Sequence, residues 1–119
     1  MALSDNNISS VPSNLVTGRT ALTDIYMYDN VIDEMPSLVG LSNMNIISAS
    51  GNVITSYNYN AFLDSFKAVP SSAGSLYIAP AQYGGCVSNA TAGVSAYTTL
   101  STTKGWSISD GGQAACSIV

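Results

Sequence analysis

Residues able to carry out covalent or acid–base chemistry are scarce in this sequence, and their spacing favours no active site. The chain has no histidine, which removes the usual general base near neutral pH and every Ser–His or Cys–His pair. Asp33 and Glu34 are adjacent in sequence, so their side chains point in different directions and form no acid/base pair. Cys86 and Cys116 are too few for a zinc site. We therefore expect a non-enzymatic protein that holds neither a cofactor nor a metal.

Charge is equally scarce. Three cations, Arg19, Lys67 and Lys104, stand against seven acids in 119 residues, for a net charge of -4. Because phosphate binding depends on clustered Lys and Arg, nucleic acid is not an expected partner. No window approaches the roughly 18 apolar residues that cross a bilayer, so membrane insertion is not expected either. A surface kept soluble by neutral polar groups is suited to packing against neighbouring subunits.

Short segments with the same spacing of apolar residues and asparagine recur along the chain. Residues 22–36 fit the pattern LxxLxLxxNxLxxLP over its full length, with Ile and Met at some leucine positions. Asparagine recurs at the same pattern position, 24 and then 22 residues apart, at Asn6, Asn30 and Asn52. Weaker copies centred on Leu76 and Trp106 follow. Internal repetition of this kind predicts a stack of similar units.

The pattern resembles that of the leucine-rich-repeat family over nearly the whole chain. The resemblance implies an α/β solenoid: one domain of about five coils with a parallel sheet on one side and helices in the last two coils. The coils fall near residues 1–20, 21–40, 41–71, 72–101 and 102–119. Helical spacing at 59–69 and 92–104 predicts two helices, ended by Pro70 and Gly105. The stretch 92–112 is also similar to the ends of repeat arrays in phage structural proteins and bacterial surface proteins.

In such a stack, inward side chains touch their equivalents in the next coil. Two columns are predicted: Met1, Ile25, Ile47, Leu76 and Trp106, then Leu3, Met27, Ala49, Ile78 and Ile108. At the bends, backbone groups lose their strand partners, and an amide side chain can both donate to them and accept from them. Asn6, Asn30 and Asn52 are therefore expected to form a ladder. The alternative is that they are ordinary turn residues.

The two cysteines lie five residues past the bend position of their coils, in the column that Val11, Met35 and Tyr57 occupy earlier. Stacked neighbours on parallel strands are about 4.8 Å apart, within the Cα window of about 4.4 to 6.8 Å that a disulfide permits. We therefore expect a Cys86–Cys116 disulfide that stabilises the terminal coil by roughly 3 to 4 kcal/mol. Two buried thiols, as in an intracellular protein, remain the alternative.

Side chains that alternate with the inward columns face outward from the strands and form the expected binding surface. They are Asp24, Tyr26, Tyr28, Ile46, Ser48, Ser50, Ser75, Tyr77, Ser107 and Ser109. Tyrosines among small polar residues suit contact with protein or carbohydrate. Tyrosines that merely cover the sheet are the alternative interpretation.

The first coil offers no polar cap for Met1, Leu3, Ile8 and Val11, although an end coil exposes one side of its apolar columns. We expect protein subunits of an assembly to cover this N-terminal edge, or the natural chain to be longer. The leading hypothesis is a structural or attachment module of a phage virion, as a decoration or tail-associated protein. The alternative is a recognition domain of a bacterial surface adhesin that binds a host-surface protein or glycan.

Overall fold

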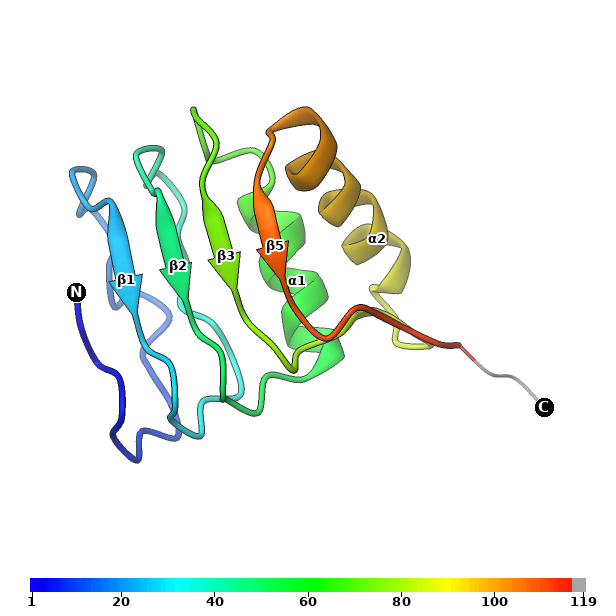
Figure 1. Ribbon diagram of the computed structural model, residues 1–119, viewed down its shortest axis with the longest axis horizontal. Coiled ribbons are helices and arrows are strands. Elements are labelled where there is room, and N and C mark those ends of the chain that lie inside the picture. The colour runs from blue at the N-terminus through cyan, green and yellow to red at the C-terminus, as the bar shows by residue number, and fades with distance from the viewer. Residues whose placement is uncertain (117–119) are drawn as a thin grey trace.

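The structure, a computed structural model, describes residues 1–116. A parallel sheet contains, side by side and in chain order, β1 (Asp24–Tyr26), β2 (Ile46–Ser48), β3 (Ser75–Tyr77) and β5 (Ser107–Ser109). A smaller parallel sheet pairs β4 (Tyr83–Gly84) with β6 (Gln113–Ala114). Figure 1 shows the four strands standing next to one another, with two helices packed together on the side of β3 and β5.

The strands form because every second side chain enters one core. Ile25, Ile47 and Leu76 lie in register at the strand centres and are fully buried. Two residues further along, Met27 and Ile78 are also buried. The side chains between them point to the opposite face, because successive residues of a strand alternate. The alternation therefore fixes which residues face outward.

The first helix, α1 (Ser56–Phe66), begins earlier than the spacing predicted. The Thr55 hydroxyl oxygen caps it by accepting a hydrogen bond from the Asn58 backbone N–H at 3.2 Å, and such caps fix helix starts. Its buried face has helical spacing and comprises Tyr59, Asn60, Phe62, Leu63 and Phe66. The helix ends at Phe66, so the prediction that Pro70 ends it was wrong. It also lies within residues 41–71, so helices are not confined to the last two predicted coils.

The second helix, α2 (Ala90–Thr98), continues into a π-helical turn at Thr99–Thr103. Together they cover most of the predicted range 92–104. Gly93 lets α2 approach α1, because a Cβ atom there would collide with the Asn60 side chain. Gly105 follows the turn with a φ of +70°, a conformation that glycine adopts without a steric penalty, and the chain then enters β5.

The predicted columns are wrong by two residues in the last strand. Leu76 pairs with Ile108 and not with Trp106, so the two strands are offset by two residues more than predicted. Tyr83 pairs with Gln113, which is the offset that the sequence predicted. The cause is that five residues separate β3 from β4 but three separate β5 from β6. Trp106 lies just before β5 and is almost fully buried. Its ring meets the Phe66 ring edge-on, with 5.3 Å between the ring centroids.

Candidate functional site

The outward side of the four-stranded sheet brings the predicted surface residues into two rows. Backbone register aligns Asp24, Ile46, Ser75 and Ser107 in one row, and Tyr26, Ser48, Tyr77 and Ser109 in the next. Ser107 therefore lies beside Ser75, although the predicted columns would have placed it beside Tyr77. We call these eight residues, with Tyr28 and Ser50 that follow β1 and β2, the strand face.

Three tyrosines belong to the strand face, namely Tyr26, Tyr28 and Tyr77. Tyr26 and Tyr77 flank Ser48 on the neighbouring strand, which places their backbones about 10 Å apart, since parallel strands lie about 4.8 Å apart. Tyr28 is 36% exposed and Tyr77 is 43% exposed, while Tyr26 is half-buried. A serine thus lies between two tyrosines on neighbouring strands, an arrangement that suits contact with a partner.

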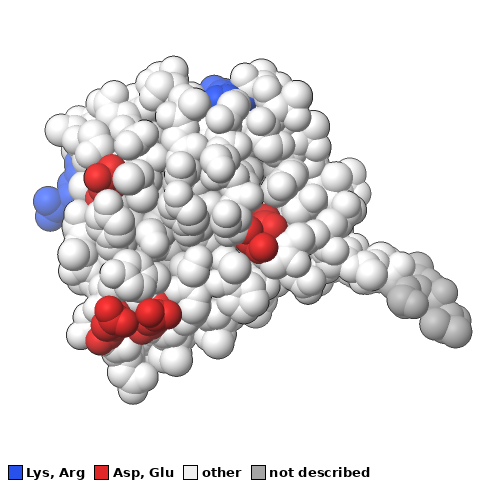
Figure 2. All heavy atoms as spheres, in the orientation of Figure 1, with Lys and Arg blue, Asp and Glu red and all other residues white. Residues whose placement is uncertain are grey.

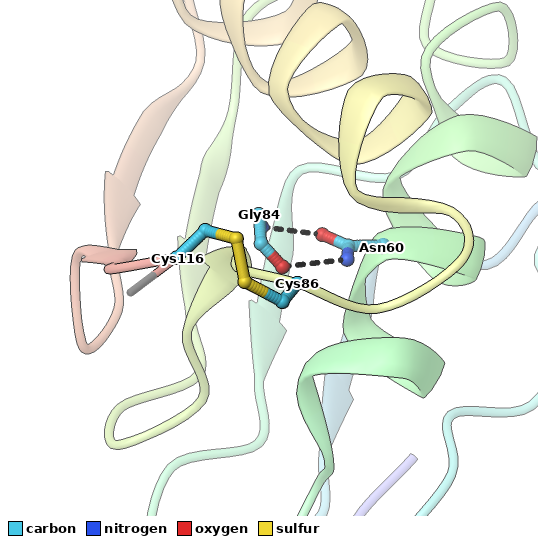
Figure 3. The surroundings of a disulfide bond; sticks show 4 residues. All are labelled: Asn60, Gly84, Cys86 and Cys116. Carbon is cyan, nitrogen blue, oxygen red and sulfur yellow. Dashed lines mark hydrogen bonds between the residues drawn. A yellow bond between two sulfur atoms is a disulfide. The ribbon is translucent and has the colours of Figure 1, made fainter. Parts of the chain in front are cut away.

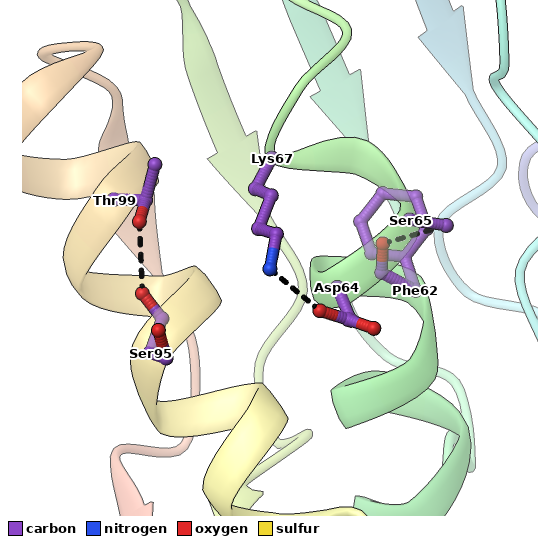
Figure 4. Close-up of polar contacts among 6 residues, drawn as sticks. All are labelled: Phe62, Asp64, Ser65, Lys67, Ser95 and Thr99. Atoms are coloured by element: carbon purple, nitrogen blue, oxygen red, sulfur yellow. Dashed lines mark hydrogen bonds and ion pairs between the residues drawn. The ribbon is translucent and has the colours of Figure 1, made fainter.

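The molecule shows little charge around this face. Figure 2 shows few charged groups on this side of the molecule, with acidic atoms gathered at the lower left and the rest lying apart on an otherwise uncharged surface. Within residues 1–116 the one ion pair joins Lys67 to Asp64 at 2.8 Å, on the surface of α1 (Figure 4). The strand face carries one charged side chain, Asp24, so electrostatic steering is weak and a partner must match this face mainly by shape and hydrogen bonding.

Several serine and threonine hydroxyl groups of the helices donate to backbone carbonyls of the same helix. Ser65 donates to the Phe62 carbonyl at 3.0 Å and Thr99 donates to the Ser95 carbonyl at 3.1 Å (Figure 4). This bonding to a carbonyl one turn earlier is typical of Ser and Thr in helices. It gives neither hydroxyl a general base that could activate it as a nucleophile.

Two of the three asparagines at the bends are buried, and their amides bond to the backbone of neighbouring bends. The Asn30 Oδ1 accepts from the backbone N–H groups of Asn6 and Ile8, at 3.1 and 3.2 Å. Asn30 and Asn52 both donate through Nδ2 to the Met27 carbonyl. Asn6 is exposed, and its amide bonds only within its own bend. The buried amides thus fix the turns that follow β1 and β2.

At the N-terminal edge, residues 1–5 pair with β1 on one side. Leu3 N–H donates to the Tyr26 carbonyl at 2.7 Å, and Tyr26 N–H donates to the Met1 carbonyl at 2.8 Å. In a parallel pair of strands, the backbone groups of alternate residues point to opposite sides of the strand. Met1 and Leu3 bond to β1, so the N–H and C=O of Ala2, which lies between them, point away from β1. Ala2 is exposed. The described residues place no strand beside it, and Met1 and Leu3 are only half-buried.

A buried phenol, which the sequence reasoning missed, ties α1 to the last turn. The Tyr59 hydroxyl donates to Asp110 Oδ2 at 2.6 Å, and the Tyr59 side chain is fully buried. Burial and the nearby Asp110 carboxylate raise the pKa of Tyr59 above its ordinary value, since both disfavour the phenolate. The sequence placed Tyr59 at the start of the predicted helix 59–69, but nothing local pointed to a partner 51 residues away.

The predicted disulfide between Cys86 and Cys116 is present, with a Cα–Cα distance of 4.8 Å (Figure 3). Both cysteines are exposed, so the alternative of two buried thiols does not hold. The prediction that Tyr57 occupies the same inward column as the cysteines was wrong. Tyr57 lies in the first turn of α1 and is 51% exposed. Beside the bond, the buried Asn60 side chain is hydrogen-bonded to Gly84 (Figure 3), a contact that the sequence did not indicate.

The remaining candidate chemistry is not brought together. Asp33 and Glu34 are both exposed. Residues 1–116 contain no group of three His, Cys, Asp or Glu side chains that could hold a metal ion. Over the same residues, no helix combines the length and the apolar character needed to span a membrane. Comparisons with models of protein families, with curated proteins and with solved structures found no match.

Proposed function

We propose that the chain is a non-enzymatic structural or attachment module of a large assembly, and that another protein subunit covers its N-terminal edge. The setting we propose is a phage virion, in which the chain acts as a decoration or tail-associated protein. We also infer that the architecture is a short leucine-rich-repeat solenoid. In-register parallel strands and buried asparagines at successive bends support that inference.

The observation that carries the proposal is that residues 1–116 place no strand beside the outward N–H and C=O of Ala2. An unpaired strand edge is a template for another chain, and natural proteins usually blunt it with charge, proline or a covering segment. Here the edge carries exposed Ala2 between half-buried Met1 and Leu3. Leu3 and Met1 already pack against the core, so an added strand would extend both the backbone ladder and the apolar layer behind it.

The neutral surface supports the same proposal. Charged residues make up 8% of the chain, so a contact with a neighbouring subunit would bury few charged groups and would carry little cost of removing charges from water. The strand face, made of Tyr and Ser with one Ile and one Asp, adds a second accessible area beside the N-terminal edge. Both features favour tight packing among neighbours over catalysis on a diffusing substrate.

Light scattering of the purified chain over a range of concentrations tests the edge. Association that increases with concentration is the expected result, whereas a monomer at every concentration would contradict the proposal. The matched variants are Ala2→Pro and Ala2→Ser. Proline removes the outward N–H of residue 2 without breaking a hydrogen bond within the chain, because Ala2 N–H faces away from β1. Ala2→Pro should abolish association, and Ala2→Ser should retain it.

The tyrosines of the strand face favour a second candidate function, a recognition domain of a bacterial surface adhesin. Aromatic rings beside hydroxyl groups suit a neutral glycan or a protein surface. An array of neutral glycans, probed with the labelled chain, would show selective binding that Tyr77→Ala removes. Tyr57→Ala is the matched control, because Tyr57 is similarly exposed but lies on α1. Binding that both variants retain would count against the strand face.

A further inference from the structure

We propose that the Cys86–Cys116 disulfide is a redox-sensitive clasp. In the oxidised chain it holds residues 113–116, here called the arm, against β4. Reduction by a dithiol would release the arm and leave the four-stranded sheet intact. This inference does not rest on the proposed function, since it follows from how firmly each side of the disulfide is anchored.

The Cys86 side is fixed to the core. Asn60 on α1 is fully buried, and its Oδ1 accepts from the Gly84 N–H at 2.7 Å while its Nδ2 donates to the Gly84 carbonyl at 3.1 Å (Figure 3). Both backbone groups of Gly84 are therefore held by one amide. Just before α2, Asn89 extends the same anchor, because its Nδ2 donates to the Tyr57 carbonyl at 2.8 Å. Cys86 lies between these two held points and cannot move far.

The Cys116 side has much less to hold it. The arm pairs with β4 over two residues only, at Gln113 and Ala114. Gln113 and Cys116 are exposed and Ala114 is half-buried, so the arm buries little apolar surface. Segments with few buried apolar contacts open first in native proteins. The covalent bond is thus the strongest restraint on the arm within the described chain.

A firm anchor lies immediately before the arm. Asp110 Oδ2 accepts the buried Tyr59 hydroxyl, and its Oδ1 accepts the Gly112 N–H at 2.7 Å. Gly111 N–H also donates to the Ala81 carbonyl at 2.7 Å. These bonds do not depend on the disulfide, so release should stop at Gly112 and should not spread into β5.

A reductant can reach the bond, because both cysteines are exposed. A thiolate of the dithiol attacks one cysteine sulfur, and the S–S bond breaks as a mixed disulfide forms. The second thiol of the reagent then displaces the remaining cysteine thiolate. The dithiol is oxidised to a disulfide, and its two hydrogens are left on Cys86 and Cys116. The arm also forms one wall of a pocket of about 420 Å³ beside the start of α2, so its release would open that pocket.

Hydrogen–deuterium exchange of the full chain, with and without dithiothreitol, tests the clasp. Thiol titration of the same samples verifies oxidation and reduction. We expect amide exchange in residues 113–116 to accelerate by about tenfold or more on reduction, as for a locally opening segment, with exchange in β5 unchanged. The Cys86→Ser/Cys116→Ser double variant should exchange like the reduced chain and should not respond to dithiothreitol.

Three results would overturn the inference. One is unchanged exchange in the arm after two thiols have appeared. Another is equal acceleration in the arm, β5 and α2, which would mean that the disulfide holds the whole terminal region and not the arm alone. The third is the titration of two free thiols in the denatured chain before any reductant is added, because no clasp would then exist.

Discussion

Replacing Asn52 by alanine removes three hydrogen bonds from the buried bend after β2. The Asn52 Oδ1 accepts from Ile32 N–H at 3.0 Å, and its Nδ2 donates to the carbonyls of Met27 and Ala49, each at 2.9 Å. Asn52 is 6% exposed, so water cannot readily replace these bonds. Met27 keeps one side-chain donor, because Asn30 also reaches its carbonyl at 3.2 Å. Ile32 N–H and the Ala49 carbonyl lose their amide partner.

The expected loss of stability follows from Ile32 N–H and the Ala49 carbonyl, the two buried groups left without a partner. A buried donor or acceptor left without a partner costs about 1 to 3 kcal/mol, so Asn52→Ala should lower the free energy of unfolding by about 3 kcal/mol. Asn6→Ala is the matched control, since it removes the same side chain at the same bend position. Asn6 is exposed and donates only to the carbonyls of Leu3 and Ser4. Water can take over those bonds, so the control should lose under about 1 kcal/mol.

Urea denaturation followed by tryptophan fluorescence measures both variants. The chain has a single tryptophan, Trp106, which is 3% exposed in the folded state and so reports unfolding. With a denaturant slope of about 2 kcal/mol per molar urea, the midpoint of Asn52→Ala should fall by about 1.5 M. The midpoint of Asn6→Ala should fall by under about 0.5 M. Equal small shifts for the two variants would refute the view that buried amides hold the bends.

Three further predictions concern the contacts among the helices and the terminal turn. Gly93→Ala should lower the free energy of unfolding by about 1 to 3 kcal/mol, because the new methyl group collides with the buried Asn60 side chain and overpacking is costly; an unchanged urea midpoint would contradict this. Burial and Asp110 raise the folded-state pKa of Tyr59 above the unfolded value of 10.0, so Tyr59 contributes stability that is full below pH 10 and is lost as the pH rises further. Tyr59→Phe should therefore flatten the alkaline loss of stability, and parallel pH profiles for variant and parent would count against it. Cys116→Ser removes the disulfide of sequence separation 30. Because the freed arm regains conformational freedom in the folded state while the four-stranded sheet stays intact, Tm should fall by under roughly 5 °C, equivalent to about 1 kcal/mol; a fall of about 10 °C or more in calorimetry under non-reducing conditions would contradict this.

The alternation of apolar and polar residues was enough to predict β1, β2 and β3, each of which buries its central side chain. The apolar residues around Ile25, Ile47 and Leu76 alternate with polar ones, and the structure places all three in register. The last strand could not be aligned in this way, because its register depends on how the chain turns between β3 and β4. That connection is two residues longer than its counterpart between β5 and β6, and the shorter one carries the contact between Asp110 and Tyr59.

The contacts that carry the clasp were only partly visible in the sequence. Cys86 and Cys116 could be paired because each lies five residues past the bend position of its own coil. The predicted offset between these two coils is correct in this region, where β4 pairs with β6. Asn60 could not be identified, because an asparagine within a helical stretch usually faces solvent. Its role depends on Gly84 and Gly93 lying against it, and such proximity between distant segments is set by packing and not by local spacing.

The most direct test of the central claim, that assembly contacts form at the N-terminal edge, is amide hydrogen exchange of the native chain measured at low and high protein concentration. The account predicts that exchange in residues 1–5 slows as concentration rises, because an added strand would bond the outward N–H of Ala2, while α1 and α2 remain unchanged. Exchange at the edge that is independent of concentration, or protection confined to the helices, would contradict it.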